Sequence, residues 1–131
     1  MTAAQELGKY SEDRAAEYLL SIGWKIIARN VKNFYGELDI VSIDTKINPQ
    51  ELVIVEVRSR TIGKIQSPLD SIGSRKLNSL VKSSREFINE IEWENFWRID
   101  VIGITMKNKN DLKDWELTHI KDITSGLNIL S

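Results

Sequence analysis

Residues 52–57, with the sequence LVIVEV, are the most apolar stretch of the chain and decide its fold class. A strand that is aliphatic at nearly every position is typical of a central strand, buried on both faces of a sheet that helices cover. Turn signals and strand-forming residues predict further strands. These lie at residues 24–31, 37–44, 96–105 and 115–120, the last of them an edge strand.

Two helices are predicted around these strands. In residues 3–22 the apolar side chains recur at the spacing of one helix face: Ala15, Tyr18, Leu19 and Ile22. A second helix is expected from Ser67 to about Glu90, because S-P-L-D supplies an N-cap serine, a proline at the first helical position and an acid three residues on. The order αβββαββ predicts a three-layer α/β domain with a mixed central sheet flanked by helices.

Composition limits what the chain can do. Its 131 residues, 41% hydrophobic and 28% charged, predict a single domain at residues 1–123 and a C-terminal tail at residues 124–131. With no cysteine and one histidine, disulfides, thiolate chemistry and a histidine-rich zinc site are excluded. There is no apolar run of about 18 residues and no apolar signal core. We therefore expect a cytoplasmic protein without a membrane partner.

Basic residues gather in the middle of the chain although the net charge is only −1. Residues 58–85 hold seven bases and one acid, a local charge of +6. This indicates either an anionic partner on one face or a solvated charged helix. Apart from Arg58, the candidate phosphate contacts in this segment are Arg60, Lys64, Arg75, Lys76, Lys82 and Arg85.

Carboxylates interrupt two of the predicted strands. If the strands at 37–44 and 52–57 are neighbours joined by a short turn, Asp39 and Glu56 can lie side by side. Two carboxylates in apolar strands are costly unless a cation neutralises them, and Mg²⁺ prefers such oxygen ligands. The Val57 carbonyl can add another oxygen. Arg58 shares a face with Glu56, so it either pairs with that acid or takes part in the chemistry.

This pattern resembles the P-D-(D/E)-x-K nuclease signature, with Asp39 first and Glu56-Val57-Arg58 after it. The wider chain resembles the YraN family of uncharacterised bacterial proteins over about residues 8–105. The matching pieces are GKYSEDRAAEYL (8–19), IIARN (26–30), GELDIV (36–41), VIVEVRSR (53–60), Arg75-Lys76 and RIDVI (98–102).

The resemblance implies a restriction-endonuclease-like, Holliday-junction-resolvase-like fold. It also implies a metal-dependent phosphodiesterase-type site at Glu12, Asp39, Glu56 and the position of Arg58, with Lys76 contacting phosphate or the site. The expected metal is Mg²⁺, or alternatively Mn²⁺, held by Asp39, Glu56, Glu12 and Val57. Arg58 stands where the family has its catalytic lysine. An arginine stays protonated, so it can stabilise charge but cannot act as a base.

Three functions therefore remain open. The first is an endonuclease that hydrolyses phosphodiester bonds in nucleic acid, structured DNA above all, acting as a monomer or a symmetric homodimer. The second is a catalytically inactive nucleic-acid-binding or scaffolding module, which the exchange at Arg58 suggests. The third is a protein-interaction domain whose acids are charge-paired. Outside the site, Arg98 and Asp100 are expected to form a structural ion pair, and His119 to be an ordinary surface residue.

Overall fold

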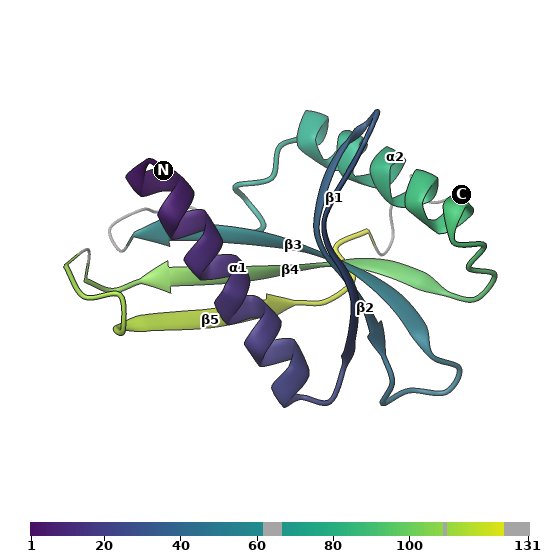
Figure 1. Cartoon of the computed structure of the whole chain (residues 1–131), viewed down its shortest axis with the longest axis horizontal. Coiled ribbons are helices and arrows are strands. Elements are labelled where there is room, and N and C mark those ends of the chain that lie inside the picture. The colour runs from purple at the N-terminus through teal and green to yellow at the C-terminus, as the bar shows by residue number, and fades with distance from the viewer. Residues whose placement is uncertain (62–66, 109, 125–131) are drawn as a thin grey trace.

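The computed structural model describes residues 1–61, 67–108 and 110–124 (Figure 1). The elements follow the predicted order: α1 (Ala3–Ser21), β1 (Lys25–Asn33), β2 (Gly36–Asp44), β3 (Glu51–Thr61), α2 (Ser74–Glu90), β4 (Trp97–Met106) and β5 (Trp115–Ile120). The strands form one sheet in the order β1-β2-β3-β4-β5. Only β3 and β4 pair in parallel, so the sheet is mixed, as predicted.

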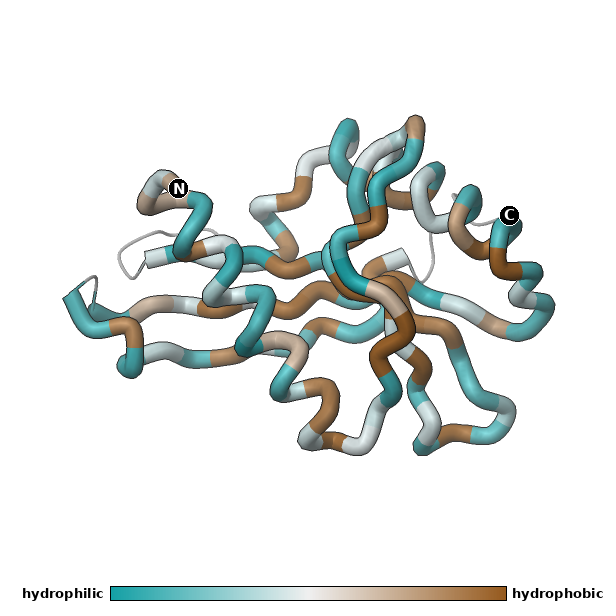
Figure 2. Tube along the Cα trace, viewed as in Figure 1, coloured by the Kyte–Doolittle hydropathy of each residue, from teal (hydrophilic) through white to brown (hydrophobic). Residues whose placement is uncertain are grey.

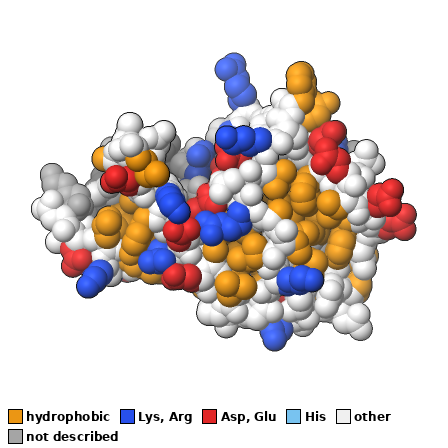
Figure 3. All heavy atoms as spheres, in the orientation of Figure 1, with side chains coloured by type: hydrophobic (Ala, Val, Ile, Leu, Met, Phe, Trp, Pro, Cys, Tyr) orange, Lys and Arg blue, Asp and Glu red, His pale blue; other side chains and the backbone are white. Residues whose placement is uncertain are grey.

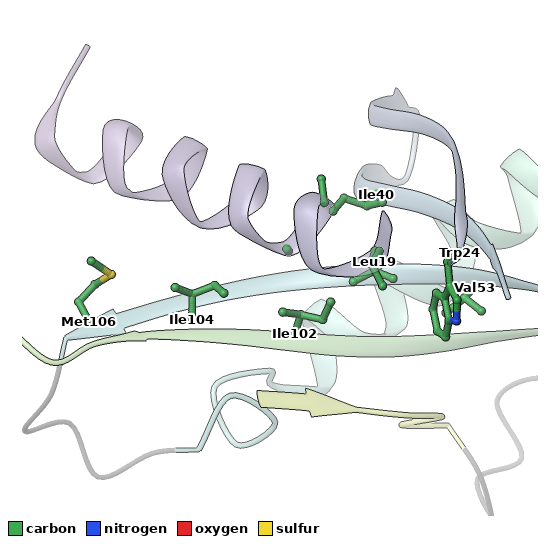
Figure 4. Close-up of a cluster of buried hydrophobic side chains, with 10 residues drawn as sticks. Leu19, Trp24, Ile40, Val53, Ile102, Ile104 and Met106 are labelled. Carbon is green, nitrogen blue, oxygen red and sulfur yellow. The ribbon is translucent and has the colours of Figure 1, made fainter. Parts of the chain in front are cut away.

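The two helices in the described ranges cover opposite faces of the sheet. Successive side chains of β3 point to opposite faces, so they pack in two different cores. Val53 and Val55 pack in the cluster under α1, whereas Leu52 and Ile54 pack in the cluster under α2. Figure 4 shows α1 running along the sheet above the first of these clusters. In Figure 2 the apolar positions concentrate along the central strands. The middle of β3 is therefore buried on both sides, as its composition predicted.

The predicted start of the second helix at Ser67 is wrong. Ser67 does cap a turn, since its Oγ accepts the Asp70 N–H at 3.1 Å, but that turn ends and α2 begins only at Ser74 after Gly73. The reason is tertiary packing: Pro68 is buried against Gly103 of β4, which holds the turn down on the sheet. At the other end of the chain, α1 begins with a capping box between Thr2 and Gln5.

A buried charge network lies between β4 and its neighbours. Arg98 contacts Asp44 at 3.4 Å, Glu51 at 3.3 Å and Asp100 at 3.0 Å, so the predicted Arg98–Asp100 ion pair is confirmed. The prediction that His119 is a surface residue is wrong. Its Nε2 lies 2.8 Å from Asp100, and its Nδ1 lies 2.9 Å from the Tyr18 hydroxyl on α1. The helix covers this part of the edge strand, which the sequence of β5 alone does not reveal.

The acid at the centre of this network is held in its charged form. Burial by itself would raise the pKa of Asp100, but hydrogen bonds from His119, Arg98 and the Asp122 backbone outweigh it and lower that pKa. The carboxylate is therefore fully supplied with donors. The network is structural in character.

Neither helix in the described ranges is both long enough and apolar enough to cross a membrane. Of the predicted C-terminal tail, Thr124 is buried, and residues 125–131 lie outside the described part of the chain.

Gly103→Ala is expected to destabilise the fold by about 1–3 kcal/mol, the usual cost of overpacking. A Cβ at this position would lie 2.1 Å from Cγ of Pro68, so the turn or the strand must move. Urea denaturation measures the change. Gly8→Ala is the matched control: its Cβ meets nothing within 4 Å in helix α1, so it should stabilise the protein by about 0.5–1 kcal/mol. Equal effects of both substitutions would contradict the packing argument.

Arg98→Met is expected to cost about 3–5 kcal/mol at neutral pH, because it leaves buried Asp44 and Asp100 without their cation. The same denaturation assay measures it, and the loss should shrink in acid as the Asp100 carboxyl takes up a proton. Lys107→Met breaks an exposed ion pair with Glu116, which water screens, so it should change stability far less than Arg98→Met. A comparably small cost for Arg98→Met would show that the network contributes little to stability.

Candidate active site

The candidate site lies where β2 separates from β3. Their paired residues run from Asp44 and Glu51 to Ile40 and Val55. The next residues in register are Asp39 and Glu56. Here the Asp39 side chain lies between the two strands, and its Oδ2 accepts the Val57 backbone N–H at 2.8 Å. We call this place the β2–β3 fork. The sequence correctly predicted that the two acids come from neighbouring strands, side by side.

The Asp39 and Glu56 carboxyl groups strongly influence each other. Burial raises the pKa of Asp39, and the charge and hydrogen bonding of Glu56 raise it further, to about 7. The Val57 N–H and Lys76 oppose this shift without cancelling it. The Asp39 carboxyl can therefore hold its proton up to near neutral pH.

The two oxygens of Glu56 have different surroundings. Its side chain is only 3% exposed. Oε2 lies 3.4 Å from the Lys76 ammonium of α2 and 3.8 Å from the Arg58 guanidinium. Oε1 is buried, and no hydrogen-bond donor within the described ranges reaches it. A buried carboxylate oxygen without a donor is costly, so a cation or a proton at this atom would stabilise it.

Arg58 is held by two contacts. One Nη lies near Glu56, and the other donates to the Ser71 carbonyl at 2.9 Å. Ser71 belongs to the turn that Pro68 fastens to the sheet. Arg58, Ser59, Ser67 and Ser71 also line a hollow of about 450 Å³ beside the fork. The contact between Arg58 and this turn was not predicted, since no local pattern signals it.

Glu12 lies nearby on α1, but it is engaged elsewhere. Arg29 of β1 donates to its Oε1 from Nε at 3.2 Å and from Nη2 at 3.1 Å, and Nη2 also donates to Asp13 at 2.7 Å. Burial raises the pKa of Glu12, and the Asp39 charge adds to this against the effect of Arg29. In the described ranges no three acids or histidines are grouped closely enough to hold a metal together. Figure 3 shows acidic and basic side chains intermingled in the middle of one face.

The remaining basic candidates lie on α2, on β3 and outside the described residues. Arg75, Lys82 and Arg85 are exposed on α2, and at about 100° per residue Lys76 points to a different side of the helix from Arg75. Arg60 is half-buried on β3 and donates to the Thr105 hydroxyl at 3.1 Å. Lys64 lies outside the described residues. The structure thus brings Asp39, Glu56, Arg58 and Lys76 together.

Asp39→Asn is expected to change how stability depends on pH in a metal-free buffer. Because the folded pKa of Asp39 is above its unfolded value, the wild type loses stability as pH rises from about 4 to about 7. The asparagine variant lacks that loss, so above pH 7 it should gain on the order of 4 kcal/mol relative to the wild type. Urea denaturation across this range in EDTA measures the difference.

Asp13→Asn is the control for this experiment. Hydrogen bonding from Arg29 lowers the pKa of Asp13, so its replacement should remove a stabilising contribution that is present above pH 4. The two variants should therefore shift stability in opposite directions at neutral pH. Identical pH profiles for Asp39→Asn and the wild type would contradict the strained carboxyl pair.

Comparison with known proteins places the chain in a family. Residues 11–104 match the model of the uncharacterised protein family UPF0102. A UPF0102 protein of Marinobacter nauticus is 39% identical over 103 residues, covering 78% of this chain and 80% of its own length. A UPF0102 protein of Mycobacterium bovis is 35% identical over 126 residues and covers 94% of both chains.

A further relative, from Clostridium botulinum strain Eklund 17B, is 34% identical over 119 residues, covering 90% of this chain and 93% of its own length. Among solved structures, Pyrococcus furiosus SfsA in complex with Ca²⁺ aligns with a TM-score of 0.32 and 15% identity, over 91% of this chain and 64% of that one. That similarity is too low to assign a fold. The sequence matches are sufficient, and the chain belongs to UPF0102, the family also known as YraN.

Proposed function

We propose that this protein binds nucleic acid and is a Mg²⁺-dependent endonuclease that hydrolyses phosphodiester bonds in structured DNA. The observation that carries the proposal is the carboxyl pair at the β2–β3 fork. Asp39 and Glu56 lie together, with one buried Glu56 oxygen open to a cation and two basic side chains beside the other. Hydrolysis of a phosphodiester needs such a combination of hard oxygen ligands and positive charge.

The donor set at the fork fits a magnesium ion. Asp39 and Glu56 offer carboxylate oxygens, and Val57 offers its carbonyl. In an extended strand the N–H and C=O of one residue point to the same side, so the Val57 carbonyl faces the gap into which its N–H donates to Asp39. When bound, the ion would lower the pKa of a coordinated water and neutralise charge on the phosphate. Mn²⁺ has similar ligand preferences and is the alternative.

The neighbouring side chains would act on the phosphate and on the acids. The Lys76 side chain is 41% exposed, so its ammonium can contact both Glu56 and a phosphate oxygen. Arg58 stays protonated and would stabilise the negative charge that develops on the phosphate oxygens. Arg29 holds Glu12 near the fork, which suits contact with the metal through a water.

We also assign the domain to the restriction-endonuclease-like fold, in its Holliday-junction-resolvase-like form. What supports this is the mixed sheet between two helices and the place of the acids on β2 and β3. The protein would act in the cytoplasm, and a symmetric homodimer would present two forks to the two strands of a branched DNA.

Wild-type protein with Mg²⁺ or Mn²⁺ is expected to nick branched DNA, and Asp39→Asn and Glu56→Gln should lower the rate by at least about 100-fold, since each removes a metal oxygen. Gel analysis of labelled four-way and forked DNA measures the rates. Glu116→Gln, an exposed acid on β5, should cleave like the wild type. Cleavage that persists unchanged in both fork variants would come from a contaminant and would remove the proposal.

A catalytically inactive DNA-binding module is the second candidate, and one observation favours it. Arg58 replaces the lysine of the nuclease signature and is tied to both Glu56 and Ser71. The variant Arg58→Lys separates the two candidates in the same gel assay. A gain of cleavage with unchanged DNA affinity would favour the inactive module. A loss of cleavage would support a working site that uses arginine.

A further inference from the structure

We propose that the tip of the β1–β2 hairpin, formed by Phe34 and Tyr35, is a base-stacking site that holds an unpaired DNA base beside the active site. This inference rests on the proposed function and specifies its substrate: a strand with at least one unpaired base a few nucleotides from the bond that is cut. Four features support this proposal. The Phe34 ring is exposed, and α2 holds the hairpin tip in place. Basic side chains lie next to the tip, and the tip is close to the β2–β3 fork along β2.

The tip exposes aromatic surface that the fold does not use. Phe34 is 94% exposed and Tyr35 is 42% exposed, and their rings meet edge to face with centroids 5.2 Å apart. In Figure 3 apolar side chains protrude at the upper edge of the molecule, where Figure 1 places this hairpin tip. An open aromatic face can stack on any base, and an aromatic neighbour fixes the orientation of the ring.

The hairpin tip is also held firmly. The Ser79 hydroxyl of α2 donates to the Tyr35 carbonyl, and Asn33 Nδ2 donates to the Ser83 carbonyl at 3.0 Å. Gly36 lies so close to α2 that a Cβ would come within 2.9 Å of the Ser79 Oγ. The tip therefore presents Phe34 from a backbone fixed on the helix, and little conformational entropy is lost when a base stacks on it.

Positive charge lies next to the tip. Tyr35, Lys82, Arg85, Glu86 and Asn89 line a shallow hollow of about 520 Å³ between the hairpin and α2. Two bases against one acid favour the phosphate backbone of a strand whose base reaches the ring. Stacking aromatics combined with a basic groove are the usual means of holding a single strand.

The distance along β2 links this site to the fork. Gly36, at the base of the tip, is three residues from Asp39, which corresponds to about 10 Å of strand or roughly three nucleotide steps of a stacked DNA strand. In an intact duplex both faces of each base are covered by its neighbours. The hairpin would therefore favour forks, gaps and junctions, where a base is free near the cleaved bond.

The test measures DNA binding by the full chain in EDTA, where cleavage does not occur. The probe is a forked oligonucleotide with 2-aminopurine at the first unpaired positions, compared with a blunt duplex of the same length. Phe34→Ala should weaken fork binding about 10-fold, should remove the quenching of 2-aminopurine, and should change duplex binding less than about 2-fold. Phe34→Trp should keep both signals. Leu112→Ala, another exposed apolar residue at 50% exposure, is the matched control and should behave like the wild type.

Equal fork affinity and equal quenching in Phe34→Ala and the wild type would overturn the stacking site. So would an equal loss of fork and duplex binding, since that would indicate a general contact. A wild type that quenches 2-aminopurine in EDTA but never cleaves DNA with Mg²⁺ would support the stacking site while removing the nuclease. Because Phe34 is almost fully exposed, thermal melting of the variant should match the wild type, which separates loss of binding from loss of folding.

Discussion

Two largely buried carboxyl groups that lie side by side need a proton or a cation to offset their charge. The contacts around Asp39 and Glu56 follow from this requirement. β2 parts from β3 at these residues and continues with β1 toward α2. Helix α2 places the Lys76 ammonium beside the Glu56 carboxylate. The turn that begins at Pro68 holds Arg58, which donates to the Ser71 carbonyl. The charge of the pair is thus partly balanced by Lys76 and Arg58, while one buried Glu56 oxygen has no donor within the described ranges.

The contrast with the second buried charge network is informative. Around Asp100, a histidine, an arginine and a backbone amide supply donors, and its pKa is lowered. At the fork, a buried oxygen has no donor within the described ranges, and the pKa of Asp39 is raised. The first arrangement stabilises the fold, since each buried charge has its partners. The second has a cost for stability that binding of a ligand would offset, which is why the chemistry is assigned to the fork.

The sequence predicted those features that depend on local periodicity. Alternation and the short turn before Leu52 placed Asp39 and Glu56 together, and the aliphatic run of β3 predicted its central position. It did not predict features that depend on tertiary contact. Pro68 packs against Gly103 and holds on the sheet a turn that resembles a helix start, α1 covers His119, and Arg29 binds Glu12. In each case the deciding partner is at least 17 residues away and has no signature of its own.

The packing of α1 has a consequence for how the protein forms during translation. Ala15 and Leu19 share a core with Ile102 and Ile104, and Tyr18 bonds to His119, 101 residues later. Helix α1 therefore has no complete surface to bury itself against until β4 and β5 have been synthesised. Its apolar side stays solvent-accessible for that time, and the N-terminal half by itself should be a ready target for chaperones.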